Sequence, residues 1–209
     1  MPTKSFSLEA GGTRKLAISW RGAWRDFTVQ YDHSTVLTVP DQKALRSGAS
    51  VTLPDGSSLS VRLERRFLGP ELVLTRNRVP VSGSNTDPET LVKTSVSILY
   101  FVAGASALLG IAVEVFDIRM FRVLGFGISS IVSGAIFGVL GYFAQRRSRI
   151  ALGTAIVLFA IDGVIGIAVA AEHTGSPPGG ALLVRIMFIV AMVRGYIALG
   201  SLTHPSKGV

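Results

Sequence analysis

Apolar and polar residues alternate with a period of two in short runs between Lys15 and Val81. This period is typical of β-strands that bury one face and expose the other. A strong turn sequence, PDGS at residues 54–57, separates two of the alternating runs. Residues 1–81 are therefore predicted to form a β-rich domain, a small all-β antiparallel sandwich or roll. The apolar positions of the pattern are Leu16, Ile18, Trp20, Phe27, Val29, Tyr31, Val51, Leu53, Leu59, Val61, Leu63, Leu72 and Leu74.

Four long apolar stretches follow a polar segment, residues 82–93, that we interpret as a linker. The hydrocarbon core of a membrane is about 30 Å thick, so a helix that rises about 1.5 Å per residue crosses it in about 20 residues. Each stretch is long enough. The sequence therefore predicts a membrane α-helical domain over residues 94–204, followed by a tail at 205–209. The four expected transmembrane helices cover about 94–116, 122–144, 150–171 and 181–203.

Composition supports a lipid bilayer as the main partner of the second half. Hydrophobic residues make up 48% of the chain and charged residues only 16%. The formal net charge is +8, but the basic residues are scattered among acids or stand at helix ends, so no nucleic-acid partner is expected. The chain has no cysteine, which excludes disulfides, thiol catalysis and cysteine-based metal sites.

The charges of the loops predict how the helices are oriented. The loop after the second helix carries Arg146, Arg147 and Arg149, whereas residues 172–180 carry one acid and no Lys or Arg. Basic loops stay in the cytoplasm, so this loop is expected there. With four spans, both termini and the β-rich domain are then cytoplasmic. Residues 1–12 lack the apolar stretch of a signal peptide, which agrees with this localisation.

Small residues form a stripe on one face of the second helix. They recur every three or four residues, and two of them form a GxxxG pair that allows close helix approach. We expect this face to pack inside the four-helix unit, and the alternative is that it forms the seam of a homo-oligomer. The stripe consists of Gly127, Ser130, Gly134, Gly138 and Gly141.

Charged residues within the apolar stretches are the candidate functional residues. Asp162 and Arg194 are predicted to lie at similar depth on antiparallel helices and to form an ion pair. A second pair is predicted between Glu114 and Arg185, and the alternative is that Arg185 extends to the lipid headgroups. These pairs either lock the register of the helices or belong to a proton or ion pathway.

The sequence lacks the common motifs of catalysis and cofactor binding. It contains no HExxH, no Walker-type loop and no second deep carboxylate beside Asp162 for aspartyl proteolysis. The three histidines, at positions 33, 173 and 204, are far apart and have no second ligand at metal-site spacing. The sequence therefore predicts a protein that is not an enzyme and has no cofactor.

Two segments carry a resemblance to known proteins. The helical part, from LYFVAGASALLG through FGVLGYFAQRRSRIAL and LFAIDGVIG to LLVRIMFIVAMVRGYIAL, resembles a group of uncharacterised bacterial membrane proteins with a β-domain before four helices. The β-rich domain, with VTLPDGSSLSVRLERR and ELVLTRNRVPVSGSNTDP, is weakly similar to the sandwich of Fas apoptotic inhibitory molecules. The resemblance implies a bacterial inner membrane and transfers no functional residue.

These observations predict a non-enzymatic anchor, scaffold or sensor. Its cytoplasmic β-domain would bind a protein partner, with Trp20 and Trp24 near the binding face. The alternative is a small transporter or channel-like unit that uses Asp162, Arg194 and the glycine stripe.

Overall fold

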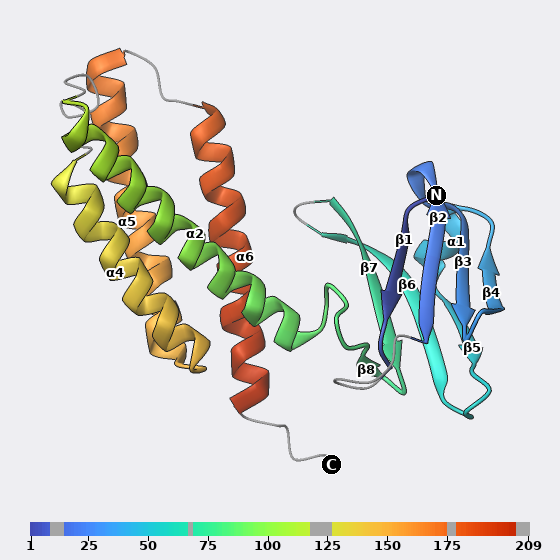
Figure 1. The fold of residues 1–209 in the computed structure, drawn as a ribbon. Coiled ribbons are helices and arrows are strands. Elements are labelled where there is room, and N and C mark those ends of the chain that lie inside the picture. Colours follow the sequence, from blue (N-terminus) through green and yellow to red (C-terminus); the bar gives the residue numbers. More distant parts are fainter. Residues whose placement is uncertain (9–14, 67–68, 118–126, 175–178, 204–209) are drawn as a thin grey trace. The chain divides into compact units, whose positions relative to one another are not determined.

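A computed structural model of the chain describes residues 1–8, 15–66, 69–117, 127–174 and 179–203. The chain divides into two compact units, Met1–Thr90 and Leu91–Val209 (Figure 1). The first is the β-rich domain and the second is helical, so the predicted fold class is confirmed.

The first unit contains two four-stranded antiparallel sheets, in which strands that follow each other in the chain also pair. A one-turn 3-10 helix, η1 (Gly22–Trp24), joins β2 to β3, and α1 (Gln42–Ser47) leads from the first sheet to the second. The first sheet consists of β1 (Thr3–Phe6), β2 (Leu16–Arg21), β3 (Arg25–Tyr31) and β4 (Ser34–Val39). The second consists of β5 (Ala49–Thr52), β6 (Ser58–Arg66), β7 (Gly69–Arg76) and β8 (Val79–Pro80).

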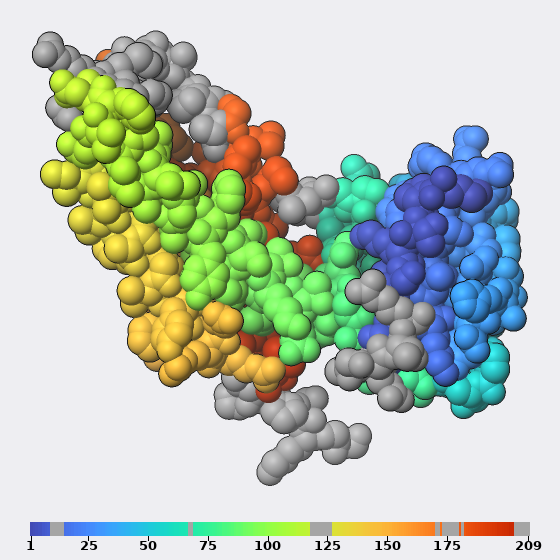
Figure 2. All heavy atoms as spheres, viewed as in Figure 1, coloured from blue at the N-terminus to red at the C-terminus, as the bar shows by residue number. Residues whose placement is uncertain are grey.

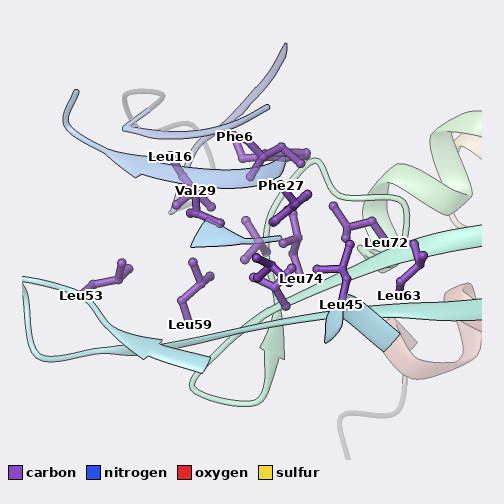
Figure 3. Close-up of a cluster of buried hydrophobic side chains, with 14 residues drawn as sticks. Phe6, Leu16, Phe27, Val29, Leu45, Leu53, Leu59, Leu63, Leu72 and Leu74 are labelled. Carbon is purple, nitrogen blue, oxygen red and sulfur yellow. The ribbon is translucent and has the colours of Figure 1, made fainter. Parts of the chain in front are cut away.

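Both sheets contribute to one hydrophobic core (Figure 3). Leu16 and Phe27 from the first sheet are fully buried, as are Leu59 and Leu74 from the second. Leu45 closes the core from α1. The period of two therefore has the predicted consequence: alternate residues of each strand point into the space between two sheets. The domain is a small β-sandwich.

A charged network stabilises the turn between β5 and β6. The Ser57 hydroxyl and backbone N–H donate to Oδ1 of Asp55 at 2.6 and 2.9 Å, and Arg76 donates to Oδ2 at 2.8 Å. Arg76 also donates to the Ser57 hydroxyl at 2.9 Å. These contacts, the Ser57 hydroxyl first, lower the pKa of Asp55 below its ordinary value of 3.8.

Asp55→Asn is expected to lower the stability of the β-domain near neutral pH, and the difference should vanish in acid. The folded pKa lies below the unfolded one, so the carboxylate's contribution is present above about pH 3.8 and is lost as the pH falls through the folded pKa. Both tryptophans of the chain lie in this domain, so tryptophan fluorescence of the full protein reports its unfolding alone. Equal denaturation midpoints for both proteins at neutral pH would contradict this account.

The second unit contains four helices long and apolar enough to cross a membrane. These are α2 (Pro88–Val115), α4 (Ile128–Gln145), α5 (Arg149–Thr174) and α6 (Gly179–Thr203). The first residues of the predicted span 122–144, up to residue 126, and the tail 205–209 lie outside the described residues.

Helix α2 begins six residues earlier than the sequence predicts and takes in half of the expected linker. Asp87 explains this start, because its carboxylate accepts from the Thr90 hydroxyl at 2.8 Å and from the Glu89 backbone N–H at 3.4 Å. Pro88 follows this cap in the first helical position, where a missing N–H costs nothing. Glu89 in the first turn also complements the positive end of the helix dipole.

The helices pack as antiparallel neighbours around an apolar core. The first turns of α2 contact the middle of α6, where the Ser95 hydroxyl donates to the backbone oxygens of Leu91 and Ala191. Phe137 of α4 meets Phe159 of α5 edge to face, with ring centroids 5.9 Å apart. Figure 2 shows α2 (green) and α4 (yellow) in contact along much of their length. Each helix therefore touches at least one neighbour through buried side chains.

Candidate functional site

A salt bridge joins α5 to α6 in the apolar segments. Nη2 of Arg185 donates to Oδ2 of Asp162 at 2.6 Å. The guanidinium also lies over the Phe159 ring, 5.0 Å from its centroid, in a cation–π contact. The Asp162 side chain is 53% exposed and that of Arg185 is 26% exposed. The pair thus lies at the surface of the helical unit.

Two glycines of α5 make room for the arginine. A Cβ on Gly163 would lie 2.7 Å from Cδ and Nη1 of Arg185, and one on Gly166 would lie 3.7 Å from Nη1. A larger residue at position 163 would therefore collide with the Arg185 side chain. The side chain occupies a groove that these glycines create beside Asp162.

The structure shows a different pairing of the charged residues from the predicted one. Asp162 pairs with Arg185, and an arginine side chain is long enough to reach several ångströms along the helix. By residue count from the α5–α6 connection, Asp162 lies about 18 Å and Arg185 about 9 Å along their helices, and the long side chain closes this difference. Arg194 is half-buried on α6 and has an interaction of its own.

Glu114 does not pair with Arg185 either. It lies near the end of α2 against α4, where a Cβ on Gly127 would come within 2.6 Å of Oε1 of Glu114. Arg185 faces α5, so the two side chains belong to different helix contacts. Residue counts along the helices place Glu114 and Arg185 at similar depth, but they do not fix the rotation of α6.

The small-residue face of α4 packs against α2 of the same chain. A Cβ on Gly134 would lie 2.7 Å from the carbonyl oxygen of Ala103 and 2.9 Å from the backbone nitrogen of Ala107. Gly141 faces Leu99 and Tyr100 of α2 in the same way. Toward the end of α2, Gly110 lies equally close to Gly127 and Ile131, and Ser130 of α4 is half-buried. The interpretation as internal packing fits these contacts.

The arginines of the loop between α4 and α5 stack on tyrosines. The guanidinium carbon of Arg146 lies 4.6 Å from the Tyr142 ring centroid, and that of Arg149 lies 4.9 Å from Tyr196. Arg147 is exposed and has a φ of 64°. Tyrosine beside arginine is typical of the membrane–water interface, so this end of the bundle has the chemistry of a headgroup layer.

The turn between β2 and β3, residues 20–26, forms the Trp hairpin. The rings of Trp20 and Trp24 stack with centroids 4.9 Å apart and planes 17° apart. Ala23, Trp24 and Asp26 all have a positive φ, between 51° and 63°. Such left-handed residues cost about 1 kcal/mol or more each unless they are glycine. The sandwich core supports both rings, which are half-buried against it.

The Trp hairpin is flanked by positive charge. Arg21 and Arg25 are exposed, and Arg21 lies 3.7 Å from Asp26 across the turn. The tryptophans thus form a partly exposed aromatic platform between two arginines. Sequence reasoning identified both tryptophans but had no signal for their stacking, because residues 22–24 do not match a common hairpin turn.

A polar groove on the outer face of the second sheet was not predicted. Ser60 of β6 stands opposite Thr75 of β7, and the Ser58 backbone N–H donates to Oδ1 of Asn77 at 2.9 Å. Arg78 completes the lining. The alternate polar positions of β6 and β7 are the signal that could have indicated it.

No protein-family model, curated protein or solved structure matches the chain. The described residues also contain no group of three His, Cys, Asp or Glu side chains that could hold a metal ion. The fold defines the class of protein: a β-sandwich followed by four helices with the length and hydropathy of membrane spans.

Proposed function

We propose that this protein is a membrane-anchored binding protein, in which the β-domain holds a protein partner and the four helices serve as anchor. The Trp hairpin is the observation that carries the proposal. Tryptophan and arginine dominate the energetic centres of protein interfaces. Strained left-handed backbone is typical of functional sites, and here it stacks the two rings near the surface. Arg21 and Arg25 favour a partner segment with acidic and apolar residues.

The helix contacts, taken with the positive-inside rule, support a cytoplasmic β-domain. The start of α2 packs through Ser95 against α6 from its middle onward, at Ala191 and Gly195, and the start of α5 packs through Arg149 against Tyr196 just beyond. The connection from the β-domain therefore enters the bundle at the arginine end. The positive-inside rule then puts the β-domain in the cytoplasm. A bacterial inner membrane, and the likeness of the domain to Fas apoptotic inhibitory molecules, belong to this proposal and rest on sequence patterns.

Site-specific crosslinking in the membrane tests the proposal. A photo-reactive residue at Ala23, at the tip of the Trp hairpin, should capture one discrete protein. The same residue at Val79, which is 64% exposed on β8, is the matched control and should not capture it. Trp20→Ala or the exposed substitution Arg25→Glu should reduce capture at least about tenfold, the effect of losing an interface hot spot. The captured protein, once identified and purified, should bind the wild-type chain, and Trp20→Ala or Arg25→Glu should weaken this binding.

Capture of the same proteins from Ala23 and Val79, or capture that neither Trp20→Ala nor Arg25→Glu reduces, would contradict the proposal. Arg25→Glu is the control for misfolding of Trp20→Ala, because Arg25 is exposed and its side chain is not part of the core.

A transporter or channel-like unit is the alternative function. The Asp162–Arg185 pair within an apolar span favours it. The glycine face of α4 offers it no support, because α2 lies within contact distance of Gly134 and Gly141. Flux through liposomes that depends on pH and is abolished by Asp162→Asn would favour the transporter over the anchor.

A further inference from the structure

The Asp162–Arg185 pair has more hydrogen-bonding capacity than its own chain uses. One bond, between Arg185 Nη2 and Asp162 Oδ2, is the hydrogen bond that the described part of the chain supplies to the two side chains. Arg185 carries five N–H donors and the carboxylate has two oxygens. Oδ1 of Asp162 and most donors of Arg185 are thus left for another group. About half of the Asp162 side chain is exposed.

This exposure conflicts with a lipid environment. The pair lies inside the segments Arg149–Val169 and Leu182–Leu202, whose composition suits the hydrocarbon core. Polar groups without partners are costly there, and charged residues of membrane helices face a bundle interior, a partner or water. Lipid tails can supply no hydrogen bond to Asp162. The exposed atoms of the pair therefore need a polar group beside them.

The exposed residues around the pair form a surface that we name the α5–α6 face. Asp162 stands one helical turn from its α5 neighbours on this surface, and Arg185 one turn from its α6 neighbour. The surface has a charged centre within an apolar rim. It consists of Leu158, Asp162, Ile165, Gly166, Leu182 and Arg185.

We propose that the α5–α6 face binds a second copy of this chain in the membrane, so that Asp162 of each copy also bonds to Arg185 of the other. A two-fold axis along the membrane normal keeps every residue at its own depth, so the second copy brings the same two charges to the level where they are needed. In a two-fold interface, if residue i contacts j, then j contacts i. An acid and a base side by side are self-complementary under this operation and form an alternating ring of four charges.

The seam that the sequence offered for a homo-oligomer was the glycine face of the second helix. That face is filled by α2, as the contacts of Gly134 with Ala103 and Ala107 show. The charge pair thus moves the expected interface to α5 and α6. A different membrane protein would have to bring polar groups to the same depth to cover this face.

Disulfide trapping in membranes tests this interface, because the chain has no cysteine of its own. Ile165→Cys, one turn from Asp162 and 58% exposed, should form a disulfide-linked dimer of the full chain. Val132→Cys is the matched control. It is 53% exposed on α4 and lies at similar depth, about 20 Å from the arginine end against about 24 Å for Ile165. Its dimer band should stay at background.

Charge variants then test the bond between copies. In the Ile165→Cys background, Asp162→Asn should lower the dimer yield about tenfold, the scale of one polar contact between membrane helices. Asp162→Arg alone and Arg185→Asp alone should give almost no dimer. When these two variants are expressed together with different tags, the mixed dimer should return, because each acid then meets a base across the interface.

Three results would overturn the proposal. The first is an equal dimer yield for Ile165→Cys and Val132→Cys. The second is trapping of a different protein in place of a second copy. The third is that Asp162→Asn leaves the dimer yield unchanged, together with no mixed dimer when Asp162→Arg and Arg185→Asp are expressed together. The first comparison uses native charges, so misfolding of a charge variant cannot obscure it.

Discussion

Gly134→Ala is expected to destabilise the helical unit strongly relative to Gly138→Ala, which should not destabilise it. Both residues lie on the same face of α4 and face the same helix. An added Cβ at Gly134 would lie 2.7 Å from a backbone oxygen of α2, so the helices must separate. At Gly138 the nearest atom is Cβ of Ala103, 3.9 Å away, which is an ordinary contact. The gain in helix propensity, about 1 kcal/mol, is common to both and cancels in the comparison.

The expected loss for Gly134→Ala is about 1–3 kcal/mol, the usual cost of overpacking, relative to Gly138→Ala. Thermal unfolding of the purified full-length protein, followed by helical circular dichroism, measures it. Tryptophan fluorescence of the same samples should not change, because both tryptophans lie in the β-domain. Equal melting temperatures for the two variants would show that α2 and α4 do not approach as closely as the structure has them.

Local sequence patterns predicted most of the fold. Period-two alternation identified the buried residues of β6, such as Leu59 and Leu63, because strand geometry alone sends them to one face. Length and hydropathy identified the four helices. The start of α2 was missed although its signal is present: Asp87-Pro88-Glu89 is a helix cap, and it was interpreted as part of a linker.

The candidate site was harder to predict because it depends on how the helices rotate. Counting residues gave the depth of Asp162 but not the direction in which Arg185 points, and a long side chain makes depth a weak guide. Gly163 and Gly166 next to Asp162 were the overlooked signal for a bulky neighbour. The stacking of Trp20 on Trp24 depends on left-handed backbone at non-glycine residues, which no local pattern indicates.

The two ends of the helical bundle are expected to lie on opposite sides of the membrane, so a reagent that cannot cross it should label one end almost completely and the other hardly at all. The helix contacts place the connection to the β-domain at the arginine end, and Glu172 near the end of α5 lies at the opposite end. The positive-inside rule then predicts a cytoplasmic β-domain and an external Glu172. Binding of a cytoplasmic partner through the Trp hairpin depends on this arrangement.

Single cysteines test it directly in a chain that has none. Ala23→Cys reports the β-domain and Glu172→Cys the opposite end of the bundle, and both positions are exposed. In bacterial spheroplasts, a membrane-impermeant maleimide should label Glu172→Cys before lysis and Ala23→Cys only after lysis. Labelling of Ala23→Cys in intact spheroplasts, or equal labelling of both cysteines, would contradict the account of a membrane-anchored protein with a cytoplasmic binding domain.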